Sequence, residues 1–197
     1  HILPPEFQNR RSEFTNLDET FSDLLGNPTA KIATAEDLIE AMDRDGVDVS
    51  VVMGFGWNDH GIARASNDYI INSVAKYPTR LRGFAGINPS WGDMAIDEVE
   101  RCANRGLLGI GEMHPDTQHF DIGSSAFMQP LMDIVNSLEL MVTTHCSEPV
   151  GHRYNGKGTV HPGALWQFVK AFPNLTIICA HWGGGLPFYA LMPEVRK

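Results

Sequence analysis

The chain has 197 residues, and its 24 acidic and 15 basic side chains give a formal net charge of −9. Apolar residues make up 43% and charged residues 20% of the sequence, a composition typical of a folded globular protein and too apolar for disorder. The acidic balance argues against nucleic-acid binding, and no apolar run reaches the ~18 residues that a membrane-spanning helix needs. The three cysteines are far apart in the sequence, so we expect free thiols, no disulfide framework and a cytoplasmic location.

The first part of the chain, residues 2–33, is polar and irregular, with several prolines and glycines. Its scattered apolar residues permit a short helix or two. A long excursion of this kind is more often a functional loop than a linker. We therefore predict that residues 2–33 form a loop or lid, within a single domain that spans residues 1–197.

A regular alternation of helix and strand follows this excursion. Thr34, with Asp37 three residues later, predicts the start of a helix that ends at Gly46. Residues 47–55 are a β-branched run without strict alternation, which predicts a strand buried on both faces. Residues 62–77 then predict a second helix.

The same alternation continues to the end of the chain. Further strands are predicted at residues 81–89, 107–115, 138–146 and 175–183, and helices at residues 92–105, 127–138, 162–172 and 186–197. The period of roughly 30 residues is that of a βα unit, so we predict an α/β fold with a parallel sheet flanked by helices. An open doubly wound sheet and a (β/α)₈ barrel both fit this pattern. A barrel needs about 250 residues, more than the chain has, whereas no glycine-rich nucleotide fingerprint follows the first strand to favour the open sheet.

Residues that can bind metals or transfer protons gather where the predicted strands end. They are Asn88, Glu112, His114, His145, Glu148 and His181, with Trp57 and Trp182 nearby. The carboxyl ends of parallel strands are where α/β folds build their sites. These side chains therefore have the positions of a candidate site.

His145 and His181 each end an apolar run, at equivalent positions about one βα unit apart. A single histidine of this kind is explained equally well as a core residue with one hydrogen bond, but two favour metal ligands or a proton shuttle. Glu112 lies within an apolar strand, where a carboxylate needs either an ion pair with lysine or arginine or a bound metal. The sequence leaves both alternatives for Glu112 open.

Five segments carry a resemblance to a known family. They are the opening HILPPEF and the segments GVDVSVVMGF, GIGEMHPD, THCSEPVG and FPNLTIICAHWGGGLPFY. With them the whole chain resembles the amidohydrolase-related family, which includes decarboxylases similar to aminocarboxymuconate semialdehyde decarboxylase. This resemblance implies a (β/α)₈ TIM barrel with a divalent metal, usually zinc, at the strand mouths. Since only about strands 1–6 can be matched, we expect an incomplete barrel.

The resemblance also implies roles for individual residues. His1 resembles the second histidine of the family's His-x-His pair after strand 1, and His145 resembles the strand-five ligand. His181 resembles the strand-six histidine, which is a ligand in some members and an acid–base residue in others. The family's last ligand, an aspartate after strand eight, has no counterpart in the chain. We thus predict His1, Glu112, His145 and His181 as metal ligands, His181 and Glu112 as catalytic residues, and Trp57, His114 and Trp182 as substrate contacts.

The function predicted from these features is a metal-dependent hydrolase that acts on a small carbonyl or carboxylate substrate. Zinc lowers the pKa of a bound water to about 7 and so supplies the nucleophile. The alternative on the same scaffold is a zinc-dependent nonoxidative decarboxylase, in which His181 helps to protonate the substrate carbon. A third possibility is a noncatalytic degenerate barrel. We further expect a small-molecule substrate and a homo-oligomer, specifically a dimer.

Overall fold

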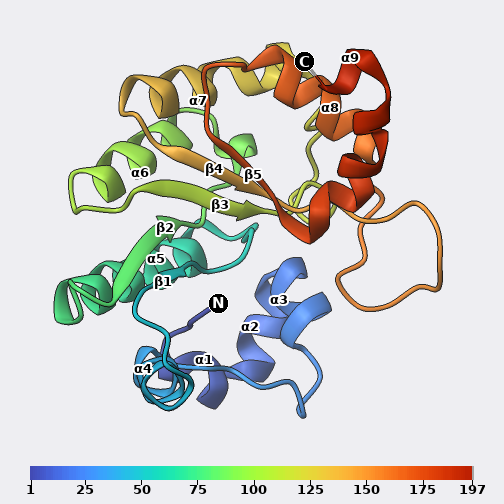
Figure 1. The fold of residues 1–197 in the computed structure, drawn as a ribbon. Helices are drawn as coiled ribbons and strands as arrows, with labels where there is room; N and C mark the ends of the chain where they lie inside the picture. Colours follow the sequence, from blue (N-terminus) through green and yellow to red (C-terminus); the bar gives the residue numbers. More distant parts are fainter. Residues whose placement is uncertain (197) are drawn as a thin grey trace.

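The computed structural model describes residues 1–196, which contain one parallel sheet (Figure 1). Its strands are β1 (Ser50–Val52), β2 (Leu81–Ala85), β3 (Gly109–Met113), β4 (Met141–Thr144) and β5 (Ile177–Cys179). They lie in the order of the chain, and each pairs with the next in parallel. All five strands fall within the predicted runs, so the predicted α/β class is confirmed. Each strand is shorter than its run, because residues at one or both ends of the run lie outside the sheet.

Helices precede the first strand in the chain, connect consecutive strands and follow the last strand. They are α1 (Pro5–Asn9), α2 (Arg11–Leu17), α3 (Glu19–Leu25), α4 (Ala35–Asp45), α5 (His60–Lys76), α6 (Asp93–Ala103), α7 (Ser125–Ser137), α8 (Pro162–Ala171) and α9 (Pro193–Arg196), with 3₁₀ segments η1 (Pro89–Trp91) and η2 (Ala180–Leu191). Figure 1 shows α5, α6 and α7 side by side along one face of the sheet, with α1, α2 and α3 apart from them. Among the described helices, none is long and apolar enough to cross a membrane.

The local signals for helix ends are confirmed. The Thr34 side chain accepts a hydrogen bond from the Asp37 backbone, and the Asp37 side chain accepts from the Thr34 backbone, which forms a capping box at the start of α4. Gly46 ends this helix with a φ of 70°, a left-handed conformation that glycine adopts without a Cβ penalty. Pro162 occupies the first turn of α8, where its missing N–H leaves no bond unmade.

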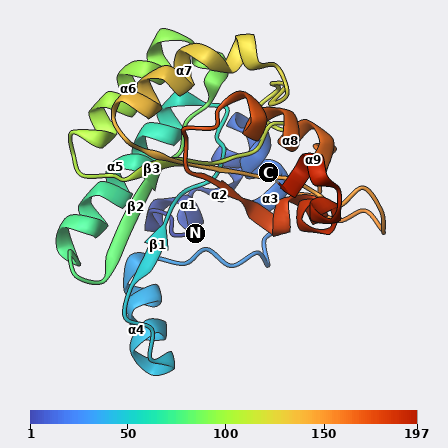
Figure 2. The ribbon, with the colours of Figure 1, turned by 45° about the horizontal axis from the view of Figure 1, so that its top comes forward.

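The prediction that residues 47–55 form a strand buried on both faces is wrong. Val51 is 53% exposed, whereas its neighbour Val52 is 1% exposed, and Val47 and Val49 are exposed as well. The physical reason is that β1 is an edge strand with one partner, β2. Helix α4, which precedes β1, lies at the margin of the described chain in Figure 2; its buried residues Ala35 and Met42 pack into the main core, but it leaves Val51 exposed.

Residues 2–33 contain the short helices α1, α2 and α3, with irregular stretches before and after them. Three phenylalanines of these helices, Phe7, Phe14 and Phe21, form a second apolar cluster together with the fully buried Trp57. Asp18 connects the excursion to the loop after β1, because its carboxylate accepts hydrogen bonds from the backbone N–H groups of Asn58 and Asp59 at 2.7 and 2.8 Å. The excursion is therefore packed on the body of the protein; its role as a lid remains a prediction.

Candidate metal centre

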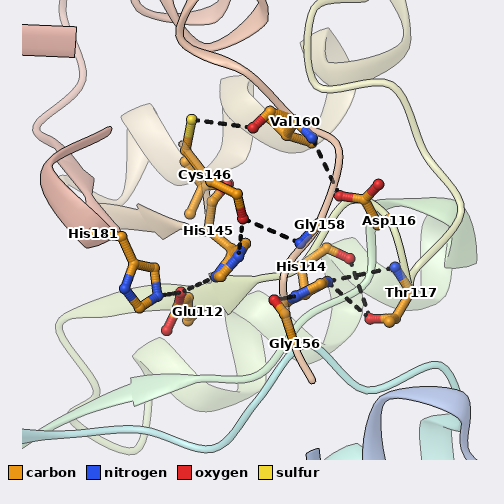
Figure 3. A network of polar contacts seen from close by, with 12 residues as sticks. Glu112, His114, Asp116, Thr117, His145, Cys146, Gly156, Gly158, Val160 and His181 are labelled. Carbon is orange, nitrogen blue, oxygen red and sulfur yellow. Dashed lines mark hydrogen bonds and ion pairs between the residues drawn. The ribbon is translucent and has the colours of Figure 1, made fainter. Parts of the chain in front are cut away.

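Four predicted ligands meet at the carboxyl edge of the sheet. Glu112 comes from β3, His145 directly follows β4, and His181 lies in η2 just after β5. Glu112 Oε1 lies 3.0 Å from His145 Nδ1 and 3.7 Å from His181 Nε2. On the opposite side, Glu112 Oε2 lies 3.4 Å from His1 Nε2. Figure 3 shows the side chains of His145 and His181 converging on Glu112.

The position of His1 is fixed by the loop after β1. Its Nδ1 atom lies 2.8 Å from the Gly54 carbonyl oxygen, and its ring stacks on Phe55 with centroids 4.0 Å apart. A carbonyl oxygen only accepts hydrogen bonds, so Nδ1 carries the proton in this contact. The Nε2 atom of His1 then faces Glu112, 3.4 Å from Oε2.

An irregularity in β3 aims Glu112 into the site. The register between β3 and β4 shifts between Ile110 and Met113, and a bulge of this kind redirects a side chain. Gly111 makes the shift possible, since its φ is 123° and a Cβ there would clash with the Thr143 carbonyl oxygen. The glycine before Glu112 is thus required by both conformation and space.

The variant Gly111→Ala is expected to destabilise the protein by at least about 2 kcal/mol, since it adds a backbone clash to an unfavourable φ. The matched control is Gly106→Ala, because Gly106 also has a positive φ, of 90°, but a Cβ added there would meet no other atom within 4 Å. The control is expected to lose only about 1 kcal/mol. Urea unfolding of both variants measures the difference, and equal losses would show that the Thr143 contact is unimportant.

A left-handed turn brings His181 toward Glu112. Residues 181–185 all have positive φ, from 54° at His181 to 98° at Gly185. This conformation costs about 1–2 kcal/mol for each residue with a side chain, and the three consecutive glycines limit the cost to two residues. Gly184 packs directly on the loop after β4, because a Cβ there would clash with the Ser147 carbonyl oxygen.

Glu112 is ionised in this environment. Burial would raise the pKa of its carboxyl group, but hydrogen bonds with His1 and His145 outweigh burial and hold the pKa well below its usual range. Within the described residues, the ion-pair partners of Glu112 are these two histidines and His181, with no lysine or arginine among them. This geometry favours the metal alternative for Glu112 over a structural ion pair.

The donor set fits a divalent metal ion. Glu112, His145 and His181 each offer a ligand atom, and these atoms lie within 4.8 Å of one another. One carboxylate and two imidazoles are donors typical of zinc and also suit other first-row metals such as manganese. His1 supplies a further imidazole on the other side of the carboxylate.

His114 lies beside the cluster, buried against it. Its ring stacks on His145 with centroids 4.3 Å apart, its Nε2 atom lies 3.2 Å from the Gly156 carbonyl oxygen, and its Nδ1 atom lies 3.1 Å from Thr117 Oγ1. Burial and the neighbouring His145 lower the pKa of His114. Both ring nitrogens thus face protein atoms, which leaves only the ring surface for the predicted substrate contact.

The structure does not bring the two predicted tryptophans together at the site. Trp57 is fully buried against Phe7, Phe21 and Phe55 and does not line the cavity that contains the histidines. The aromatic surface of Trp57 packs against these phenylalanines. Its position after a strand in the sequence does not indicate this packing. Trp182 is 77% exposed and lines a neighbouring hollow of about 630 Å³ that shares His181 with the site.

The cavity of the site measures about 180 Å³. Its walls include residues that the sequence analysis missed, namely Leu24, Phe55, Gly56, Tyr154, Asn155 and Gly156. Helix α3 and the loop after β4 meet here, because the Gly156 N–H donates to Asp23 Oδ2 at 2.9 Å. This contact joins residues 133 positions apart in the sequence, so no local motif predicts it.

Asp116 fixes the far end of this loop. Its carboxylate accepts hydrogen bonds from the backbone N–H groups of Thr159 and Val160 and from the Thr159 hydroxyl. Burial would raise the pKa of Asp116, but these hydrogen bonds outweigh it and lower the pKa from its ordinary value. The ionised carboxylate therefore stabilises the folded state.

The variant Asp116→Ala is expected to lose about 1 kcal/mol of stability at pH 7, a value reduced for partial exposure of the carboxylate. Because the pKa is lowered on folding, this stabilisation is complete above the unfolded-state pKa of about 3.9 and is lost as the pH falls toward the lower folded-state pKa. Urea unfolding at pH 7 and in steps below pH 4 is the measurement. A difference from the parent that grows on acidification would contradict the assignment.

Comparison with known proteins identifies the family. The amidohydrolase family model matches residues 25–197. The chain belongs to the amidohydrolase family. Among curated relatives, gamma-resorcylate decarboxylase from Polaromonas sp. strain JS666 is 28% identical to this chain over 153 residues. The alignment covers 64% of this chain and 46% of the relative. The chain thus spans about half the length of the curated relatives that it matches.

Solved structures confirm the barrel fold of this amidohydrolase. A 5-carboxyvanillate decarboxylase from Novosphingobium aromaticivorans, complexed with manganese and 4-hydroxy-3-methoxy-5-nitrobenzoic acid, has a TM-score of 0.76 at 18% identity, over 96% of this chain and 65% of that chain. A 2,6-dihydroxybenzoate decarboxylase from Rhizobium has a TM-score of 0.65 at 20% identity, over 97% and 67% of the two chains. The five parallel strands are therefore part of an incomplete TIM barrel, and the open doubly wound alternative is excluded.

Proposed function

We propose that this amidohydrolase is a metal-dependent enzyme that removes CO₂, without oxidation, from a small aromatic carboxylate. The observation that carries the proposal is the cluster of Glu112, His145 and His181 within one small cavity at the carboxyl edge of the sheet. The names of the relatives support decarboxylation over the hydrolysis predicted from the sequence. A shared fold does not fix a reaction, so an assay for CO₂ release and for hydrolysis decides between the two.

In this proposal Glu112, His145 and His1 hold the metal. The ionised Glu112 supplies the negative charge, and the two histidines offer imidazole nitrogens on either side of it. A divalent ion bound there would supply a Lewis acid that polarises the oxygens of the substrate. Zinc was expected from the resemblance, whereas manganese accompanies the 5-carboxyvanillate decarboxylase; metal analysis of the purified protein decides between them.

His181 is proposed to donate the proton that the substrate carbon takes up. Its side chain is 56% exposed, compared with 8% for His145, and it borders both the site cavity and the neighbouring hollow. An imidazolium at His181 would give its proton to the ring carbon that carries the carboxylate. The bond from this carbon to the carboxylate then breaks, its electron pair restores the aromatic ring, and CO₂ leaves. His181 regains a proton from solvent.

The size of the cavity supports a substrate with one ring. Its volume of about 180 Å³ is below the ~300–1,000 Å³ of pockets that hold drug-sized ligands. Phe55 and the ring of His114 line it and offer flat surfaces against which an aromatic ring can pack. A homodimer remains part of the proposal, which sedimentation of the purified protein tests.

The deciding experiment supplies the protein, loaded with Mn²⁺ or Zn²⁺, with a panel of hydroxybenzoates and, separately, with simple amides and lactones. We expect CO₂ release from at least one hydroxybenzoate and its loss after chelation of the metal. Hydrolysis of an amide or lactone without CO₂ release would instead support the hydrolase. Neither activity in a protein that binds metal would support the noncatalytic barrel.

A further inference from the structure

Ser147 occupies a buried position next to the candidate metal centre, although it is not one of the proposed ligands. Its side-chain oxygen lies 2.9 Å from His145 Nε2 and 3.1 Å from the backbone nitrogen of Gly158. The residue is 3% exposed, so these contacts are shielded from water. The hydroxyl group thus joins the ring of His145 to the loop that closes the cavity.

The hydrogen-bonding capacity of the hydroxyl restricts what it can do here. A backbone N–H only donates, so the Ser147 oxygen accepts the hydrogen bond from Gly158. One further lone pair and the hydroxyl hydrogen remain, and one of them meets His145 Nε2. An ionised carboxylate only accepts, so in the 3.0 Å contact with Glu112 Oε1 the His145 Nδ1–H donates, and Nε2 accepts from the Ser147 hydroxyl. With a metal ion on Nδ1 instead, the ring proton would lie on Nε2, which would donate to Ser147.

This is the arrangement that metal-binding histidines use, in which the nitrogen opposite the metal is held by a hydrogen-bond acceptor. His114 restrains the same ring from its face, by stacking on it. The edge and the face of the His145 ring are therefore both supported by neighbouring side chains.

We infer that Ser147 is a positioning residue, which holds His145 Nε2 so that Nδ1 is the atom presented to the metal. The inference rests on the proposed metal site. Gly158 belongs to the loop after β4, and its amide donates to the same hydroxyl that contacts the His145 ring. The inference therefore also implies that this loop and the ligand His145 are ordered together.

The test compares Ser147→Ala, Ser147→Thr and the control Ser137→Ala, whose hydroxyl donates to the Ile134 carbonyl oxygen at the exposed end of α7. The dissociation constants of Mn²⁺ and of Zn²⁺ alone are measured by competition with a chromophoric chelator. Loss of a hydrogen-bond partner behind a ligand weakens metal binding by about 10–100-fold. We expect this loss for Ser147→Ala, recovery for Ser147→Thr, which keeps the hydroxyl, and parent affinity for Ser137→Ala.

A second readout separates positioning from a general loss of structure. The d–d absorption bands of bound Co²⁺ report the arrangement of the ligands, and we expect them to change in Ser147→Ala. The metal-free variant is expected to unfold in one cooperative transition, at a temperature lower than that of the parent by only a few degrees, because the buried Gly158 N–H loses its acceptor. Unchanged metal affinity and unchanged Co²⁺ bands in Ser147→Ala would overturn the inference. A parent protein that binds neither Mn²⁺ nor Zn²⁺ would instead overturn the proposed function, and the inference with it.

Discussion

Replacing His145 with alanine is expected to weaken the binding of Mn²⁺ or Zn²⁺ at least about 100-fold, a larger effect than the loss of a group behind a ligand, and to abolish CO₂ release. His145 is nearly buried, and its Nδ1 atom has the shortest distance to Glu112 of the three histidines. Metal content after dialysis, determined by mass spectrometry of the metal, and CO₂ release are the two measurements.

The matched control for this variant is His119→Ala. His119 is exposed and pairs with Glu19 at 2.8 Å, outside the cavity, so its loss is expected to leave both metal content and activity at the parent level. Equal metal content in His145→Ala and the parent would remove His145 from the ligand set. A similar loss in both variants would show that the effect is not local.

Replacing His181 with glutamine is expected to lower kcat by about 10²–10⁴-fold, the range for loss of a general acid, while metal content stays at the parent level. Glutamine keeps a polar group of similar reach but cannot deliver a proton at neutral pH. The exposure of His181 and its longer distance to Glu112 favour proton transfer over metal binding. Steady-state kinetics and metal analysis of the same sample are the measurements.

The two roles of His181 predict different outcomes for this variant. If metal is lost together with activity, His181 is a ligand, as the cluster with Glu112 and His145 also allows. If kcat is unchanged, the proton comes from another group or from solvent. A change in KM with kcat unchanged would assign His181 to substrate binding.

Much of the fold could be predicted from local patterns because these patterns have local physical causes. Thr34 and Asp37 cap α4 through hydrogen bonds within one turn, and runs rich in apolar residues mark the five strands, because the strands of a parallel sheet pack between layers. The exposed residues of β1 are the exception. The sequence pattern predicts that Val51 is buried, but its exposure depends on how many neighbours the strand has. The residues of the run do not contain this information.

The sequence by itself determined the α/β alternation, the family, and the residue types at the strand ends, because each depends on short segments with fixed periods. It also brought His145, His181 and Glu112 forward as candidates, since parallel strands place their carboxyl ends at one edge of a sheet. Only the tertiary structure decided which other groups complete the site. Trp57 is removed from it by packing against helices that precede it by tens of residues, and Ser147 is brought in by a hydroxyl between His145 and a loop amide. Such contacts depend on distances through space, and neither periodicity nor residue type fixes them.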